Sequence, residues 1–251
     1  MLDYLYDGTF DGFLTCVHEH YYRENAGGIF HKENYQPNLL GGYADIKTDE
    51  KKSQTVYQAI KDKISRSDVE RVYRVFLSSA PEKEIKLLRY IILGFKNGAK
   101  IRSLHGNPIV FDVQQIEKKV TFEVCRLSGL VRFTAIRGGA VLYSAIDPDH
   151  DVCELLAGHF CDRFKNDPFI IHDKGRSKAL IANGGEWYIT EFSPKSLPEL
   201  NDDEVKYRKM WKKYFDAIAI KERINPTLQR RCMPARYWKN MPEMNIGGLH
   251  T

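Results

Sequence analysis

The stretch GLVRFTAIRGGAVLYSAI, residues 129–146, decides the fold class of this 251-residue chain. Apolar residues alternate with other residues from Val131 to Ala135, and they alternate again from Val141 to Ala145. Alternation with a period of two is typical of β-strands, and glycines between two such runs suit a turn that needs positive φ. The stretch therefore predicts a β-hairpin.

Two further hairpin signals follow the first. The runs 169–172 and 178–182 flank a polar turn that contains Gly175, and the turn at 183–185 leads into the apolar run 187–190. The interval from Asp149 to Phe164 has helical periodicity and separates the first hairpin from the second. We expect an α+β fold in which an antiparallel sheet of about five strands is interrupted by one crossover helix.

Upstream of this sheet, apolar residues recur at steps of three and four, as in amphipathic helices. The exception is 25–52, which holds paired glycines and no sustained period, so we expect a long surface segment there. Asp202 and its acidic neighbours suit the N-terminus of a last, long helix. We expect one compact unit, 1–251, in which a helical N-terminal half packs on the sheet. Its sub-regions are 1–128, mainly helical; 129–192, the sheet with its crossover helix; and 193–251, a basic C-terminal helical segment.

Composition excludes several classes of protein. A content of 43% hydrophobic and 28% charged residues is typical of globular proteins and not of disordered, collagen-like or coiled-coil chains. Five cysteines without a C-x-x-C pair argue against a secreted disulfide scaffold and a zinc ribbon. The first residues lack the basic start of a signal peptide, and no apolar run approaches the roughly 20 residues that span a bilayer. We expect a cytoplasmic protein with no membrane partner.

The positive charge is concentrated in one segment. Residues 202–240 hold eleven lysines and arginines against five aspartates and glutamates, which gives +6, whereas the whole chain carries +5. Aromatic residues, among them Tyr207 and Trp211, are interleaved with these cations, a mixture that suits phosphate contact and base stacking. The structural alternative is that Trp211 and Tyr214 face the core while the lysines are only solvated.

The densest polar cluster is DPDHD, residues 147–151, at the predicted junction of a strand and a helix. Asp and His side chains together can form a hydrolytic metal site or a general acid/base pair. If His172 and Asp173, at the end of another strand, face this loop, they converge with Asp149 and His150 as catalytic candidates. The alternative is that Asp149 only caps the following helix.

Specific catalytic signatures are absent from the sequence. There is no H-E-x-x-H, no G-x-x-x-x-G-K-[ST], no G-x-G-x-x-G after a strand and no C-x-x-x-C-x-x-C. We therefore assign no metal site and no cofactor.

Seven segments of the chain carry a resemblance to a known family. They are YDGTFDGFL (6–14), GLVRF (129–133), IDPDH (146–150), HFCDRF (159–164), IHD (171–173), YFDAIAIKERINPTLQ (214–229) and MPARYW (233–238). Together they resemble one bacterial family assigned to DNA metabolism or repair, whose domain is also similar to the C-terminal fusion partner of uracil-DNA-glycosylase-family proteins. The resemblance covers nearly the whole chain except residues 25–52.

The resemblance implies a role in DNA repair beside a radical-SAM partner protein, and it carries no established catalytic residue. Among the cations, amides and rings at or near these segments, we predict a DNA-binding set. The structural alternative is that Asn225 ends a helix and that Tyr237 and Trp238 hold the tail to the core. The predicted set is Arg163, Lys213, Arg223, Asn225, Gln229, Arg231, Arg236, Tyr237 and Trp238.

Three hypotheses about function result. The first is a DNA-binding accessory protein that uses the basic C-terminal segment. The second is an enzyme acting on DNA or nucleotides, hydrolase-like or glycosylase-like, with Asp and His groups near 147–150 and 172–173. The third is a non-catalytic adaptor for the radical-SAM partner, with the segment 25–52 as its contact face.

Overall fold

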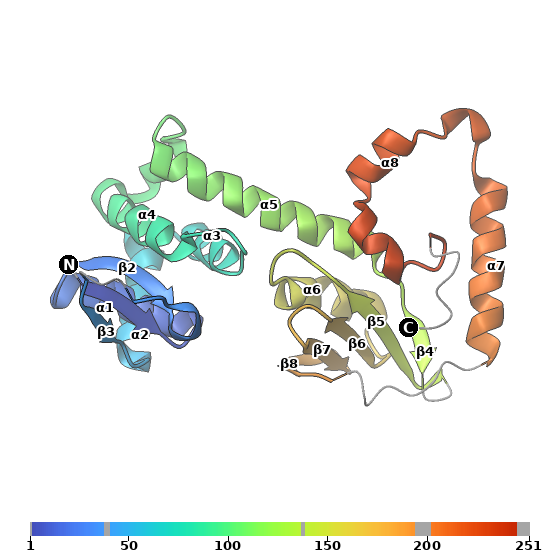
Figure 1. Cartoon of the computed structure of the whole chain (residues 1–251), viewed down its shortest axis with the longest axis horizontal. Coiled ribbons are helices and arrows are strands. Elements are labelled where there is room, and N and C mark those ends of the chain that lie inside the picture. The colour runs from blue at the N-terminus through green and yellow to red at the C-terminus, as the bar shows by residue number, and fades with distance from the viewer. Residues whose placement is uncertain (1, 38–40, 137–138, 194–201, 245–251) are drawn as a thin grey trace. The chain divides into compact units, whose positions relative to one another are not determined.

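The computed structural model describes residues 2–37, 41–136, 139–193 and 202–244 (Figure 1). Its contacts divide the chain into two compact units, 1–121 and 122–251. The boundary lies inside α5 (Pro108–Leu130). That the whole chain folds as one compact unit stays a prediction, and each unit is described by itself below.

The first unit contains a small parallel sheet that the sequence analysis missed. Its strands are β1 (Leu2–Tyr6), β2 (Ala26–His31) and β3 (Tyr43–Asp45), in the order β2-β1-β3. The segment 25–52 is therefore not simply a surface loop, because it supplies two of the three strands. Central strand β1 buries consecutive residues, so it shows no alternation of apolar and polar positions.

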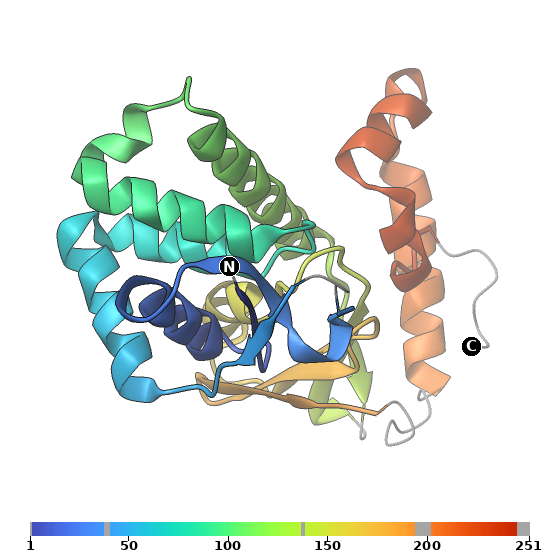
Figure 2. The same cartoon turned by 60° about the vertical axis from the view of Figure 1, so that its left-hand side comes forward.

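The helices that the periodicity predicts for this part of the chain are present, and the first and the fourth of them contact the sheet (Figure 2). Thr9 caps the first one, since its Oγ accepts the N–H of Gly12 at 3.0 Å. Ser65 caps α3 (Arg66–Phe76), because its Oγ accepts the N–H of Asp68 at 3.1 Å. The helices are α1 (Phe10–Tyr22), α2 (Glu50–Lys63), α3 (Arg66–Phe76), α4 (Lys83–Asn97) and the first part of α5.

The second unit contains the five-stranded sheet, and the α+β class is confirmed. Its strands lie in sequence order: β4 (Thr134–Ile136), β5 (Val141–Ile146), β6 (Phe169–Asp173), β7 (Lys178–Asn183) and β8 (Glu186–Glu191). All three predicted hairpins are present; Arg137 and Gly138, in the turn of the first one, lie outside the described residues.

One feature of this sheet corrects the expectation of a purely antiparallel arrangement. Strands β5 and β6 are parallel, so the sheet is mixed. The reason is the crossover helix α6 (Cys153–Phe164), which carries the chain back along the sheet before β6 begins. Helix α6 packs against β6, β7 and β8.

The predicted long C-terminal helix is α7 (Asp202–Ile218), orange in Figure 1. It is followed by the 3-10 turn η5 (Lys221–Arg223), by α8 (Pro226–Cys232) and by the 3-10 turn η6 (Ala235–Asn240). Over the described ranges, no helix combines the length and the apolar character needed to cross a membrane.

Candidate nucleic-acid interface

Two of the predicted DNA-binding residues, Arg236 and Tyr237, bind a buried carboxylate. Glu123 of α5 is 2% exposed, and its Oε1 accepts the Tyr237 hydroxyl at 2.6 Å and Nη2 of Arg236 at 2.9 Å. The same carboxylate accepts the backbone N–H groups of Asp149 at 2.9 Å and His150 at 2.8 Å. We call Glu123, Arg236, Tyr237 and the two N–H groups the Glu123 clasp.

The clasp keeps its carboxylate ionised. Burial alone would raise the pKa of Glu123, but the hydrogen bonds from Tyr237 and from the two backbone N–H groups outweigh it and hold that pKa below its usual value. Arg236 also contacts Oδ2 of Asp149 at 2.7 Å. The clasp therefore fastens η6 to the 147–150 loop and to α5, and its Arg236 and Tyr237 are engaged within the protein.

Sequence reasoning missed Glu123, although a signal for it exists. Ile116, Val120 and Leu127 are buried on α5, and Glu123 falls between them on the same stripe. A carboxylate on the buried face of a helix requires partners, because an unpaired buried charge is strongly unfavourable.

Four more predicted residues make local contacts within the protein. Asn225 caps α8, because its Oδ1 accepts the N–H of Leu228 at 3.0 Å. The indole Nε1 of Trp238 donates to the carbonyl of Met233 at 3.0 Å, and the Gln229 amide lies 3.9 Å from the sulfur of Met244. Arg163 lies on α6, where its guanidinium sits 5.4 Å from the Phe164 ring centre.

The catalytic candidates do not converge on one point. His172 and Asp173 are neighbours on β6, so their side chains point to opposite faces of the sheet. Nδ1 of His172 shares a hydrogen bond of 2.9 Å with the Tyr143 hydroxyl. Asp173 is fully buried and instead accepts Nη1 of Arg176 at 2.9 Å.

Arg176, which binds Asp173, also holds the 147–150 loop. Arg176 donates to the carbonyls of Pro148 at 3.3 Å and Asp149 at 2.7 Å, so Asp173 supports the loop through Arg176. The Asp149 carboxylate pairs with Arg236. These contacts give the DPDHD cluster a structural role in the connection between β5 and α6.

The histidines of this region favour the neutral state. Burial lowers the pKa of His172, and burial also lowers that of His150. Nε2 of His172 is buried without a hydrogen-bond partner in the part of the chain that the structure describes. A search of the described residues finds no group of three or more His, Cys, Asp or Glu side chains able to hold a metal ion.

The other basic candidates lie exposed on the surface. Lys213, Arg223 and Arg231 are exposed, and so are Lys209 and Arg230 nearby. None of these five cations forms an ion pair with a described residue. We call them the basic surface.

Three rings of α7 are also exposed, against the alternative that Trp211 and Tyr214 face the core. Tyr207 is 65% exposed, Trp211 40% and Tyr214 55%. Among the described residues, the hydrogen bond that involves one of these rings is from Nε1 of Trp211 to Oε2 of Glu243, at 3.1 Å. We call these three rings the aromatic face of α7.

Comparison with known families assigns the chain to one family. A model of the domain of unknown function DUF4130 matches residues 81–243. The chain belongs to the DUF4130 family. The matched range contains the whole Glu123 clasp, the basic surface and the aromatic face of α7.

Two further comparisons add little to this membership. No curated protein matches this DUF4130 chain. A solved structure, the pGpG-specific phosphodiesterase PggH from Vibrio cholerae, is 9% identical over 82% of this chain and 89% of its own, with a TM-score of 0.35. A likeness this low supports no argument. The glycosylase association and the radical-SAM partner stay predictions.

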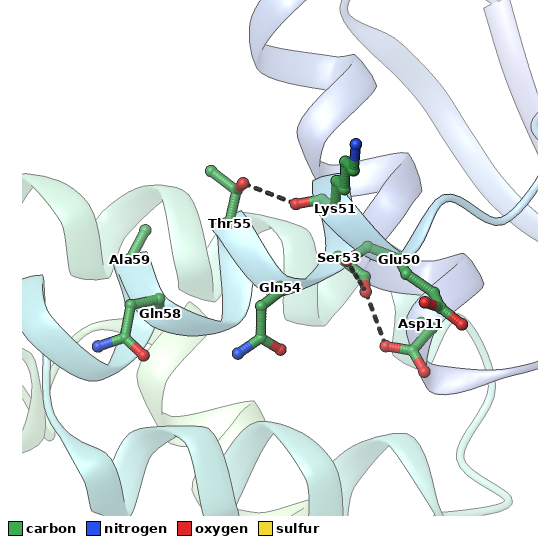
Figure 3. A pocket seen from close by; sticks show the side chains of 8 residues that line it. All are labelled: Asp11, Glu50, Lys51, Ser53, Gln54, Thr55, Gln58 and Ala59. Carbon is green, nitrogen blue, oxygen red and sulfur yellow. Dashed lines mark hydrogen bonds between the residues drawn. The ribbon is translucent and has the colours of Figure 1, made fainter.

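The first unit of the DUF4130 chain has an open pocket that is lined mostly by polar residues (Figure 3). Asp11 of α1 and seven residues of α2 line it, and Oγ of Ser53 donates to Asp11 at 2.8 Å. None of the predicted site residues lines this pocket.

Proposed function

We propose that this DUF4130 protein binds DNA through the basic surface of α7, η5 and α8. The observation that carries the proposal is that five exposed cations have no ion pair among the described residues and lie in the same segment as the exposed rings of α7. Acidic side chains of the same helix are already paired: Asp216 binds Lys212 at 2.6 Å and Glu204 binds Arg208 at 3.2 Å. No ion pair among the described residues neutralises these five cations.

Phosphate contact by such cations has a measurable signature. Each neutralised phosphate releases condensed counterions, so affinity falls steeply with salt, by a slope of about 0.7–0.9 per contact on logarithmic axes. Five contacts predict a total slope of about 3.5–4.5. This salt dependence separates phosphate binding from attraction to an apolar surface.

Fluorescence anisotropy with labelled DNA across a salt series tests the proposal. Changing all five cations of the basic surface to Gln is expected to abolish most of the affinity and of the salt slope. The matched control removes five exposed lysines from the first unit, Lys47, Lys51, Lys61, Lys96 and Lys100, also as Gln. No retention of DNA by the wild type at low salt, or an equal loss in the control, overturns the proposal.

A partnership with a radical-SAM protein is a second proposal. It is favoured by exposed aliphatic side chains in the same segment, Met210, Ile218, Ile224 and Leu228, which a partner protein would cover. Co-purification tests it, with polar substitutions at these four positions expected to reduce recovery of the partner. Deleting residues 25–52 is unsuitable as a test, because β2 and β3 would be lost with them.

A further inference from the structure

Strand β8 is an unprotected edge of the five-stranded sheet. The order β4-β5-β6-β7-β8 leaves β4 and β8 at the two edges (Figure 1). Edge β4 is only three residues long, and the guanidinium of Arg208 binds Oγ1 of its Thr134 at 2.7 Å. Edge β8 is six residues long, EWYITE, with its two charges at its ends, and it contains no proline, no lysine and no bulge in its pairing with β7. Proline, lysine and bulges are the usual devices that keep an edge strand from pairing with another chain, so β8 is open to such pairing.

The turn before β8 determines which of its backbone groups point outward. Two glycines with φ of 60° and 85° join β7 to β8, as in a two-residue type I′ hairpin. The residue pair that flanks such a turn is hydrogen-bonded, and hydrogen-bonded pairs recur at every second residue. The N–H of Phe192 continues this alternation, since it donates to the carbonyl of Ser177 at 2.8 Å. The residues whose N–H and C=O groups point away from β7 are therefore Trp187, Ile189 and Glu191.

These outward groups are unused within the part of the chain that the structure describes. No described residue forms a hydrogen bond with the outward N–H and C=O groups of β8. The edge also carries apolar surface, because Trp187 is 41% exposed and Tyr188 is 58% exposed. A row of free backbone groups beside exposed rings is the surface to which an added strand binds.

A second copy of β8 fits this edge in the antiparallel orientation. Two outward rows form hydrogen bonds only if an odd-numbered residue of one copy faces an odd-numbered residue of the other. With Ile189 on the two-fold axis, Ile189 faces itself, and Trp187 of each copy faces Glu191 of the other. Each of these facing pairs exchanges both of its hydrogen bonds, so the whole outward row of both copies is used.

The positions of the two charges agree with this register. Shifting the register by one residue would place Glu186 of one copy opposite Glu191 of the other, and like charges directly opposite each other are destabilising. That register also sets odd-numbered residues against even-numbered ones, so the outward groups would not meet. With Ile189 on the axis, Glu191 faces Trp187 and Glu186 faces Phe192. The strand is therefore complementary to itself, as a two-fold interface requires.

We propose that this protein forms a two-fold symmetric dimer in which β8 of one copy pairs with β8 of another. The two five-stranded sheets then join into one continuous sheet. The occupant of the edge is a second copy of this chain, and the proposal does not depend on the proposed binding of DNA.

Sedimentation velocity of the full chain over a concentration series tests the dimer. The wild type is expected to shift toward twice the mass of one chain as its concentration rises. Ile189→Lys places two ammonium groups opposite each other at the axis, so self-association is expected to weaken about tenfold or more. Ile189→Pro removes an N–H that β7 does not use, and it is expected to weaken self-association as well.

A matched control changes an exposed ring on another edge strand. Tyr43 lies on β3, at an edge of the sheet of the first unit, and is 58% exposed. Tyr43→Lys introduces the same charge as Ile189→Lys and is expected to leave self-association unchanged. Circular dichroism verifies that each variant is folded.

Amide hydrogen exchange of the wild type locates the interface without any variant. The outward N–H groups of β8 are expected to exchange more slowly as the protein concentration rises, because the partner strand protects them. Exchange in β3 is expected to be independent of concentration. This measurement decides the matter even where a variant of Ile189 does not fold.

Three results overturn the proposal. The first is a wild type that stays monomeric across the concentration series. The second is a dimer that Ile189→Lys weakens no more than Tyr43→Lys does. The third is a dimer in which hydrogen exchange of β8 does not depend on concentration, because its interface then lies elsewhere.

Discussion

The C-terminal segment contains two groups of basic and aromatic side chains that look alike in sequence and are used in opposite ways. Arg236 and Tyr237 are bound to buried Glu123. Lys213 and Tyr214 are exposed on α7. The difference lies in whether a carboxylate from another element meets the cation. Residue type in this segment therefore predicts the chemistry that is available but not where it is used.

The largest effect is expected from removing the centre of the Glu123 clasp. Glu123→Ala leaves the Arg236 and Tyr237 donors and two backbone N–H groups without their acceptor, so we expect the free energy of unfolding to fall by about 3 kcal/mol or more. Urea denaturation measures this loss. Glu186→Gln on the exposed edge strand β8 is the control, with an expected change within about 0.5 kcal/mol. An equally small change for Glu123→Ala would show that the clasp does not stabilise the fold.

A pair of arginine variants compares the two groups directly. Arg236→Ala is expected to lower the free energy of unfolding by about 1–2 kcal/mol and to leave the salt slope of DNA binding unchanged, because Arg236 is paired with Glu123 and Asp149. Arg231→Ala is expected to lower that slope by about one with stability unchanged. Denaturation and anisotropy measure both variants. Interchanged results would mean that the clasp arginine, and not the exposed one, contacts phosphate.

Loss of a single hydroxyl gives a smaller contrast. Tyr237→Phe removes the hydroxyl that donates to Glu123 at 2.6 Å, and we expect a loss of about 1–2 kcal/mol in the free energy of unfolding. Tyr214→Phe should change stability by less than about 0.5 kcal/mol, because its side chain is exposed. Thermal denaturation of the two variants under one buffer condition checks the difference. Equal losses of stability in the two variants would show that the Tyr237 hydroxyl does not contribute more than the exposed Tyr214 hydroxyl.

The smallest effect is expected from pH. Burial lowers the pKa of His172, and also those of His150 and His20, so the unfolded chain binds protons more readily than the folded chain. Stability contributed by these groups is present near pH 7.5 and is lost as pH falls through about 6.5, the ordinary histidine value. His172→Asn, which retains a group able to hydrogen-bond Tyr143, should make the decline between pH 7.5 and 5.5 shallower. An unchanged decline in denaturation experiments would show that His172 does not contribute to it.

Much of the fold could be predicted from local pattern. Steps of three and four residues predicted the helices of the first unit, and alternation together with the turn residues predicted all three hairpins of the second unit. The parallel sheet of the first unit could not be predicted in this way. Its strands are three to six residues long, and β1 pairs with β2 and β3 from distant parts of the chain. Such pairing depends on long-range contacts, which local periodicity does not contain.

The contacts of the candidate site were also beyond prediction from local spacing. Spacing predicted a helix that carries cations and rings, and α7 is that helix. Spacing could not show that Asp173 contacts Arg176, or that Glu123 reaches both the 147–150 loop and η6. Glu123 and Tyr237 are separated by 114 residues.

The sequence by itself determined the α+β class, the hairpins, and the concentration of positive charge in residues 202–240, because each depends on residue type and short-range spacing. Only the tertiary structure decided which cations and rings remain exposed. Burying a charge requires a partner that is supplied by another element, and whether Glu123 meets Arg236 depends on how α5, the 147–150 loop and η6 pack. The assignment of Lys213 and Tyr214 to the surface, and of Arg236 and Tyr237 to the clasp, follows from that packing.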